Sequence, residues 1–161
     1  MKVLLLEDDV ALSDILSDFL EQKGHDVFIC SRGEVALEFL IEGTFDFAIL
    51  DINTPNMSGI DVLKHVREDY KSQTPIIIMT AYQDTKHLKN AFELGSDDYI
   101  RKPFDLEELD QRINRLCRYF SIERNDDIKI SEDISFNPLE CLVMINGVKI
   151  HIAQKERDIL K

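Results

Sequence analysis

The chain has 161 residues, of which 44% are hydrophobic and 31% are charged, and its formal net charge is −12. This length suffices for one domain, or for one domain with part of another, and the composition is that of a globular protein. The negative charge argues against direct binding to a nucleic-acid backbone. No apolar run reaches the roughly 18 residues of a membrane span. Since no secretory signal follows Met1 either, we expect a cytoplasmic protein with no membrane partner.

The first part of the chain alternates between two hydrophobic patterns. The apolar run at residues 3–6 predicts a buried strand, and apolar residues at spacings of three and four predict a helix over residues 10–20. Gly24 is a plausible end for this helix. A second strand is predicted over residues 27–30, and a second helix over residues 35–40.

The alternation continues through the middle of the chain. The run at residues 47–50 is continuously apolar, which is typical of a strand buried on both faces of a parallel sheet. Pro55 cannot continue a ladder, so the chain should leave the sheet soon after this strand. The remaining predicted elements are, in order, a helix at 60–66, a strand at 76–79, a helix at 88–94, a strand at 99–100 and a helix at 106–116.

Alternating strands and helices predict an α/β fold with a parallel sheet, right-handed crossovers and helices on both faces. With five strands, we expect the flavodoxin-like strand order 2-1-3-4-5 over a first domain of residues 1–119.

The pattern changes after Tyr119. Residues 120–127 are polar and predict a linker, and residues 128–161 read as the beginning of a second domain that is cut short. A small antiparallel sheet is expected there, with Asn146-Gly147 as a hairpin turn and the start of a helix at 154–161.

Polar groups follow four of the predicted strands: Glu7 with Asp8, Asp51, Thr80 and Lys102. In the expected sheet order these strands are neighbours, so the side chains should converge at one edge. Clustered carboxylates suit Mg²⁺, and their mutual repulsion favours a bound cation. Lys102 adds a positive charge that can bind an anion or pair with Asp51.

Together these groups indicate phosphoryl transfer onto Asp51, because an aspartate can form an aspartyl phosphate. The equatorial oxygens of the transition state need neutralising charge, which the metal ion and Lys102 would supply. Thr80 would add a hydroxyl donor.

Four segments together resemble the receiver domain of bacterial two-component response regulators, over about residues 2–119. They are Leu-Glu-Asp-Asp, Leu-Asp-Ile-Asn-Thr-Pro-Asn-Met-Ser-Gly, Met-Thr-Ala and Gly-Ser-Asp-Asp-Tyr-Ile-Arg-Lys-Pro-Phe, each at the carboxyl end of a predicted strand. Each is weak alone, but in this order and at these spacings they are highly specific. The resemblance implies that Asp51 accepts phosphate from a sensor histidine kinase. It implies Mg²⁺ ligands at Asp8, at Glu7 through water, at Asp51 and at the backbone carbonyl of Asn53.

The same resemblance implies a switch. Thr80 and Tyr99 would form the switch pair, with the hydroxyl moving onto the phosphate and the ring following inward. Lys102 would hold a phosphate oxygen, and the Lys102–Pro103 peptide bond would be cis.

The tail resembles, more loosely, the start of a winged-helix effector domain, partly through Ala-Gln-Lys-Glu-Arg-Asp-Ile-Leu. In that family the recognition helix and wing lie further on, so DNA binding is expected only of a complete effector domain. Receivers of this subclass form homodimers through helix four, strand five and helix five. Asp98 and Arg112 match positions that pair across this interface.

Two other functions compete with this interpretation. A metal-dependent phosphatase with an aspartyl-phosphate intermediate would need an acidic group two residues after the nucleophile, where this chain has Asn53. A flavodoxin-like cofactor module would need a loop rich in Ser, Thr or Gly after the first strand, but this chain has Glu7-Asp8-Asp9.

Other residues have plainer interpretations. Asp9 is expected to cap the first helix, and Ser58-Gly59 to start another. The three cysteines lack metal-ligand spacing and are expected to be reduced packing residues. His25 and the other three histidines are expected at the surface.

Overall fold

The computed structural model describes residues 1–81, 91, 93–120, 122, 128–131, 134–137, 142–145 and 148–151. The chain divides into two compact units, Met1–Ile122 and Glu123–Lys161. Among the described residues, no helix is both long enough and apolar enough to cross a membrane.

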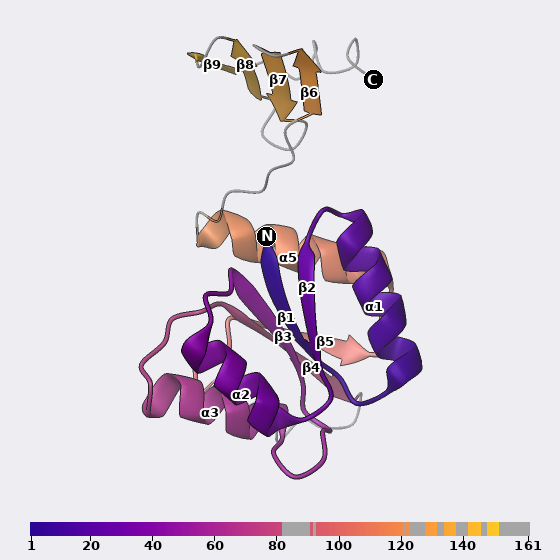
Figure 1. Ribbon diagram of the computed structural model, residues 1–161, viewed down its shortest axis with the longest axis vertical. Coiled ribbons are helices and arrows are strands. Elements are labelled where there is room, and N and C mark those ends of the chain that lie inside the picture. Colours follow the sequence, from indigo (N-terminus) through magenta and orange to yellow (C-terminus); the bar gives the residue numbers. More distant parts are fainter. Residues whose placement is uncertain are drawn as a thin grey trace. The chain divides into compact units, whose positions relative to one another are not determined.

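A five-stranded parallel sheet forms the centre of the first unit (Figure 1). Its strands are β1 (Lys2–Leu6), β2 (Asp26–Cys30), β3 (Phe47–Asp51), β4 (Ile76–Ala81) and β5 (Asp98–Lys102). The strand order β2-β1-β3-β4-β5 confirms the predicted flavodoxin-like topology. Several strand boundaries differ from the sequence prediction by one or two residues, and Thr80 and Lys102 lie within their strands rather than after them.

Helices cover both faces of this sheet. They are α1 (Val10–Gln22), α2 (Gly33–Glu42), α3 (Gly59–Glu68) and α5 (Leu106–Tyr119). Helices α1 and α5 lie on one face and α2 and α3 on the other (Figure 1). The helix predicted over residues 88–94 lies mostly outside the described residues.

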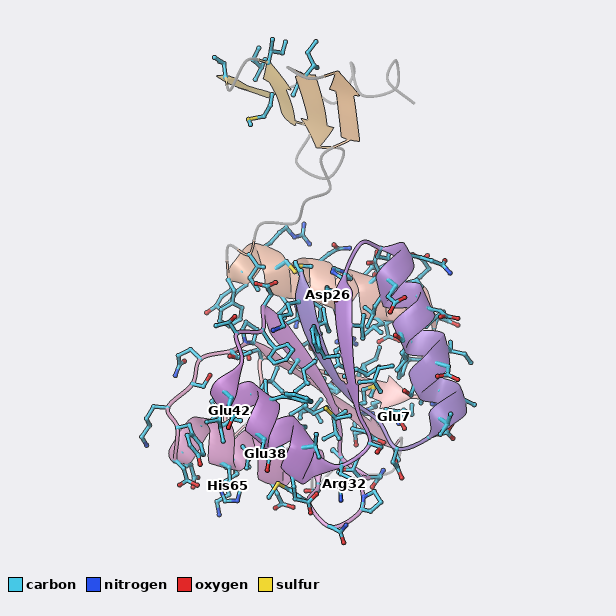
Figure 2. The ribbon with its side chains drawn as sticks, in the orientation of Figure 1. Glu7, Asp26, Arg32, Glu38, Glu42 and His65 are labelled. Carbon is cyan, nitrogen blue, oxygen red and sulfur yellow. The ribbon has the colours of Figure 1, made fainter. Side chains whose placement is uncertain are left out.

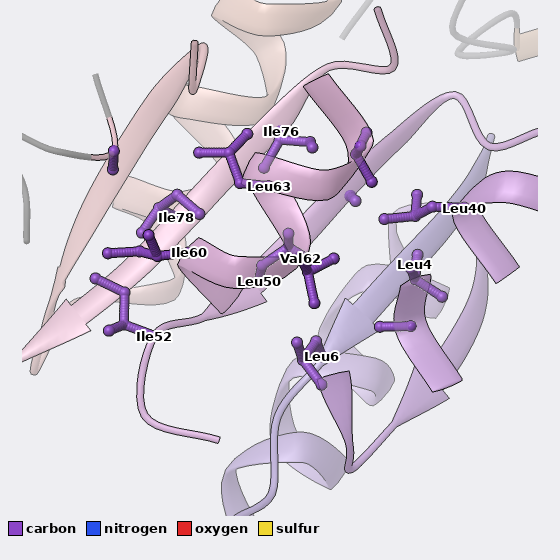
Figure 3. Close-up of a cluster of buried hydrophobic side chains, with 14 of the residues drawn as sticks. Leu4, Leu6, Leu40, Leu50, Ile52, Ile60, Val62, Leu63, Ile76 and Ile78 are labelled. Atoms are coloured by element: carbon purple, nitrogen blue, oxygen red, sulfur yellow. The ribbon is translucent and has the colours of Figure 1, made fainter. Parts of the chain in front are cut away.

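The core consists of two layers, one on each face of the sheet. Because successive side chains of a strand point to opposite faces, Leu4 and Leu6 join the layer under α2 and α3 (Figure 3), whereas Val3 and Leu5 join the layer under α1 and α5. All four side chains are completely buried. Burial of a leucine or valine side chain stabilises the fold by about 1.5–3 kcal/mol. The continuous apolar runs are therefore what fixes the strands at the centre of the domain.

Polar side chains fix the starts of two helices that leave the carboxyl edge of the sheet. The Asp9 carboxylate accepts a hydrogen bond from the backbone N–H of Leu12, at 3.0 Å, and caps α1 as expected. Ser58 and Asp61 form a reciprocal capping box at the start of α3, where the Ser58 hydroxyl accepts from the Asp61 N–H and the Asp61 carboxylate accepts from the Ser58 N–H, both at 3.1 Å. The Asp9 cap lies in the loop that carries Glu7 and Asp8, and the Ser58 cap ends the loop that follows Asp51.

His25 lies in the core, so its expected surface position is wrong. Its side chain is 6% exposed and meets the ring of Phe47 edge-on, with 5.8 Å between centroids. Cys30 and Cys117 are buried, reduced cysteines, as predicted, and burial raises the pKa of Cys30 to about 11.

The second unit contains a four-stranded antiparallel sheet in the order β6-β7-β8-β9, which confirms the predicted small sheet. The strands are β6 (Ile128–Ser131), β7 (Ile134–Asn137), β8 (Leu142–Ile145) and β9 (Val148–His151). The predicted Asn146-Gly147 turn and the helix start at 154–161 lie outside the described residues.

Candidate phosphoacceptor and metal site

The carboxyl ends of β1 and β3 bring three carboxylates together. Glu7 and Asp8 follow β1 directly, and Asp51 is the last residue of β3. One carboxylate oxygen from each of them lies within 4.8 Å of the others. Glu7 and Asp51 are buried, whereas Asp8 is exposed to solvent. Glu7 lies at the end of the sheet where the chain turns into α1 (Figure 2). The predicted convergence of these carboxylates is therefore confirmed.

Lys102 joins this cluster from β5. Its Nζ lies 2.6 Å from Glu7 Oε2 and 2.8 Å from Asp51 Oδ2. Because β4 separates β5 from β3, the lysine side chain reaches across a strand to make both contacts. The two carboxylates are almost fully shielded from water, with side chains 1% and 4% exposed. A cation is needed here, since an unpaired buried carboxylate would be costly.

The local environment changes the acidity of two groups. Burial raises the pKa of Glu7, and the nearby charge of Asp51 acts in the same direction, against the hydrogen bond from Lys102. Burial alone would lower the pKa of Lys102, but its hydrogen bonds to Asp51 and Glu7 and their negative charges outweigh it and raise the pKa. Lys102 is therefore kept protonated by the two carboxylates that surround it.

Asn53 lies in the loop that follows β3 and is exposed. Its backbone N–H donates to Asp51 Oδ1 at 3.3 Å, which places the residue beside the acidic cluster. Carboxylate and carbonyl oxygens are the ligands that Mg²⁺ prefers. The donor set of Glu7, Asp8, Asp51 and the Asn53 carbonyl therefore fits a magnesium ion.

Thr80 and Tyr99 lie on the adjacent strands β4 and β5. Thr80 is one residue beyond Met79, the cross-strand partner of Asp51. The Thr80 side chain is buried, and its hydroxyl donates to the Ala81 carbonyl at 3.4 Å. Tyr99 is half-buried, and its ring lies near two guanidinium groups, 5.8 Å from that of Arg101 and 5.6 Å from that of Arg112.

The turn after β5 has the predicted geometry, since the Lys102–Pro103 peptide bond is cis.

Asp98 and Arg112 pair with each other within this single chain, at 3.1 Å. The Asp98 side chain is 4% exposed, and Arg115 Nη2 lies 2.9 Å from its second oxygen. Arg112 also contacts Glu108, one helical turn earlier on α5. These contacts form a charged network on the β5–α5 face.

Thr54 makes a hydrogen bond that the sequence does not indicate. Its hydroxyl donates to the Met57 carbonyl at 2.8 Å, within the loop that also holds Asn53. A threonine in a loop gives no sequence signal of such a bond, because the bond depends on the chain turning back three residues later.

Comparisons with known proteins identify the family of this chain. Residues 3–114 match the family model of the response regulator receiver domain. The transcriptional regulatory protein CrdR of Helicobacter pylori is 39% identical over 99% of this chain and 71% of its own length. Some curated relatives are matched over only 58% of their length.

Solved structures show the same fold. A Francisella receiver domain, of response regulator 1452, is 32% identical with a TM-score of 0.69, over 74% of this chain and 98% of that one. The receiver domain of the sensor histidine kinase PA1611 from Pseudomonas aeruginosa, with a magnesium ion coordinated in its active site cleft, is 28% identical with a TM-score of 0.64, over 74% of this chain and 97% of that one. The chain therefore belongs to the response regulators of two-component systems, through a receiver domain that includes the acidic cluster.

Proposed function

We propose that Asp51 is the phosphoacceptor of this receiver domain and takes its phosphoryl group from a sensor histidine kinase in a magnesium-dependent reaction. The observation that carries the proposal is the meeting of Glu7, Asp8, Asp51 and Lys102 at one edge of the sheet. Burial of such a charged cluster is costly, and buried charged groups of this kind are concentrated at functional sites.

In this proposal an Asp51 carboxylate oxygen attacks the phosphorus of a phosphohistidine. A new P–O bond forms while the P–N bond breaks, and the electron pair of that bond returns to the histidine ring. Lys102 releases Asp51 and Glu7 in part and donates to an oxygen of the transferred group, so its charge offsets the negative charge that develops there. Asp51, Asp8, Glu7 and the Asn53 carbonyl would hold Mg²⁺, which would add further positive charge to offset the charge of the transferred group.

Phosphorylation would then shift the receiver between two conformations. The Thr80 hydroxyl would turn from the Ala81 carbonyl to the phosphoryl group, and Tyr99 would move inward on the neighbouring strand. The close position of Thr80 to the end of β3 supports this role. The phosphoryl group on Asp51 would shift the equilibrium between the two conformations, because it accepts a hydrogen bond from Thr80 in only one of them.

The output would be a homodimer formed through helix four, β5 and α5. In that dimer Asp98 and Arg112 would exchange partners between two copies. Two features of the β5–α5 face support such a dimer. They are its charged network and a hollow of about 340 Å³ beside Asp98 and Arg115. In a longer protein, a complete winged-helix domain would then bind DNA and control transcription. CrdR, which this chain resembles over 99% of its length, carries the name of a transcriptional regulatory protein.

The test is intact-mass measurement after incubation with acetyl phosphate and Mg²⁺. We expect the chain to gain one phosphoryl group, the Asp51→Asn variant to gain none, and the control Asp26→Asn, which alters an exposed carboxylate on β2, to react like the parent. A gain of the same size in Asp51→Asn would refute the proposal. Steady release of phosphate from a phosphomonoester would support the phosphatase alternative instead.

A further inference from the structure

The loop between β3 and α3 begins and ends at the phosphoacceptor. Asp51, the last residue of β3, precedes the loop, and Gly59, the first residue of α3, follows it and lies directly against the Asp51 backbone. A Cβ atom added to Gly59 would lie 2.9 Å from the Asp51 carbonyl carbon and closer still to its oxygen. The two ends of the loop are therefore in contact, and the loop between them holds Asn53, the proposed backbone ligand of the metal.

The Thr54 hydroxyl closes a second contact inside this loop. It donates to the Met57 carbonyl at 2.8 Å, and the Met57 N–H donates to the Pro55 carbonyl at 2.9 Å. Thr54 itself is only 9% exposed. Between these two contacts lies Asn56, whose φ of 65° is unusual for a residue other than glycine. The hydroxyl thus holds a tight, partly strained turn that starts one residue after Asn53.

Helix α2 supports the same turn from outside. A Cβ atom at Gly33, the first residue of α2, would lie 2.9 Å from both the carbonyl carbon and the Cβ of Met57, and nearer still to its carbonyl oxygen. Only glycine permits this approach, because the nearest atoms belong to backbone. The start of α2 and the β3–α3 loop lie at the same end of the sheet (Figure 1), and Arg32 and Glu7 lie toward that end as well (Figure 2).

We infer that Thr54 and Gly33 are positioning residues for the metal site, a role that rests on the proposed function. The Thr54 hydroxyl and the close contact at Gly33 both restrain the backbone of Met57. Because Thr54 is bonded to Met57, the preceding residue, Asn53, is restrained as well. In this inference, the fixed loop would keep Asn53, whose N–H donates to Asp51, in place for its carbonyl to bind the metal. Neither residue touches the metal or the phosphoryl group, so each acts through the backbone of the loop.

The test compares Thr54→Val, which removes the hydroxyl at nearly constant shape, with Thr54→Ser, which retains it. The matched control is Thr74→Val, which removes a threonine hydroxyl bonded to Ser72 at 3.0 Å, near the amino end of β4. Mg²⁺ affinity is measured by calorimetric titration with MgCl₂, stability by urea unfolding without Mg²⁺, and labelling by acetyl phosphate over a range of Mg²⁺ concentrations.

We expect Thr54→Val to raise the Mg²⁺ dissociation constant by about tenfold. Its labelling rate should return to the parent value at saturating Mg²⁺, and Thr54→Ser should restore the affinity. Thr74→Val should lose stability with unchanged Mg²⁺ affinity. Gly33→Ala, as a second variant, should weaken Mg²⁺ binding in the same way.

An unchanged Mg²⁺ affinity in Thr54→Val, with labelling of the parent chain intact, would overturn this inference and leave the proposed function standing. Equal loss of affinity in Thr54→Ser would also overturn it, because the hydroxyl would then be irrelevant. A parent chain that neither binds Mg²⁺ nor becomes labelled would overturn the proposed function and this inference together.

Discussion

The ammonium group of Lys102 lies 2.8 Å from the Asp51 carboxylate, although 51 residues separate the two positions. The same Nζ lies 2.6 Å from Glu7 Oε2, so one cation bridges two buried carboxylates, one just after β1 and one at the end of β3. This bridge shows that the edge of the sheet is arranged around a surplus of negative charge. Substitutions at this edge of the sheet, or in the loops that support it, should therefore alter labelling, metal binding or stability.

Replacing Lys102 with methionine should slow labelling by acetyl phosphate by about a hundredfold, because a positioned donor to the developing negative charge is lost. The control is Arg101→Met, which removes the same charge from the neighbouring position of β5. Labelling rates of the two variants are compared by intact mass at saturating Mg²⁺. Equal rates for Lys102→Met and the parent would show that the lysine does not act on the phosphoryl group.

Magnesium should stabilise the folded chain. A ligand that binds only the folded state at ten times its dissociation constant adds about 1.4 kcal/mol to the free energy of unfolding. Urea unfolding with MgCl₂ or with EDTA measures this difference. In Asp8→Asn, which changes an exposed side chain of the cluster, most of the gain should disappear. Identical gains in the two proteins would place the bound ion elsewhere.

Gly59→Ala should destabilise the fold by about 1–3 kcal/mol, since the new methyl group meets the Asp51 backbone and overpacking costs this much. The control Gly24→Ala places a methyl group in open space, with only the strain of a φ of +81°. Its cost should be about 1–2 kcal/mol. Labelling at Asp51 should fall in Gly59→Ala alone. If both variants label normally, the close contact at Gly59 is unimportant for the phosphoacceptor.

Ser58→Ala should lower the free energy of unfolding by about 1 kcal/mol at neutral pH, because it removes half of the capping box on α3. The hydrogen bond from the Ser58 hydroxyl lowers the pKa of Asp61 below its ordinary value of 3.8. Ionised Asp61 therefore stabilises the fold above that pH, and this contribution is lost as the pH falls through its lowered pKa. Urea unfolding at descending pH should show the cost of Ser58→Ala shrinking below about pH 4. A pH-independent cost would contradict the role of the carboxylate.

The sequence predicted the sheet because its apolar runs leave little choice. Residues 47–50 and 76–79 are continuously apolar, and such short runs are typical of strands covered on both faces. The strand order then followed from topology rules, and this order places Glu7, Asp51 and Lys102 at one edge of the sheet. The cis bond before Pro103 and the functional roles at the site came from the family resemblance.

Contacts that depend on the exact path of a loop could not be predicted. Arg67 donates to the carbonyls of Gly95, Ser72 and Thr74, and this requires knowing how two loops meet at the amino edge of the sheet. The burial of His25 has the same cause, because a single polar residue after a helix carries no periodicity. Thr54 is a third case, since its hydroxyl partner is set by a turn and not by a motif.

The most direct measurement is chemical mapping of the phosphoryl group. Borohydride reduces an acyl phosphate to an alcohol, so the labelled residue can be identified afterwards by peptide mass mapping. After treatment with acetyl phosphate and Mg²⁺, our account predicts conversion at Asp51 and none when EDTA replaces Mg²⁺. Conversion at another carboxylate, or equal conversion at Asp51 without the metal, would contradict it.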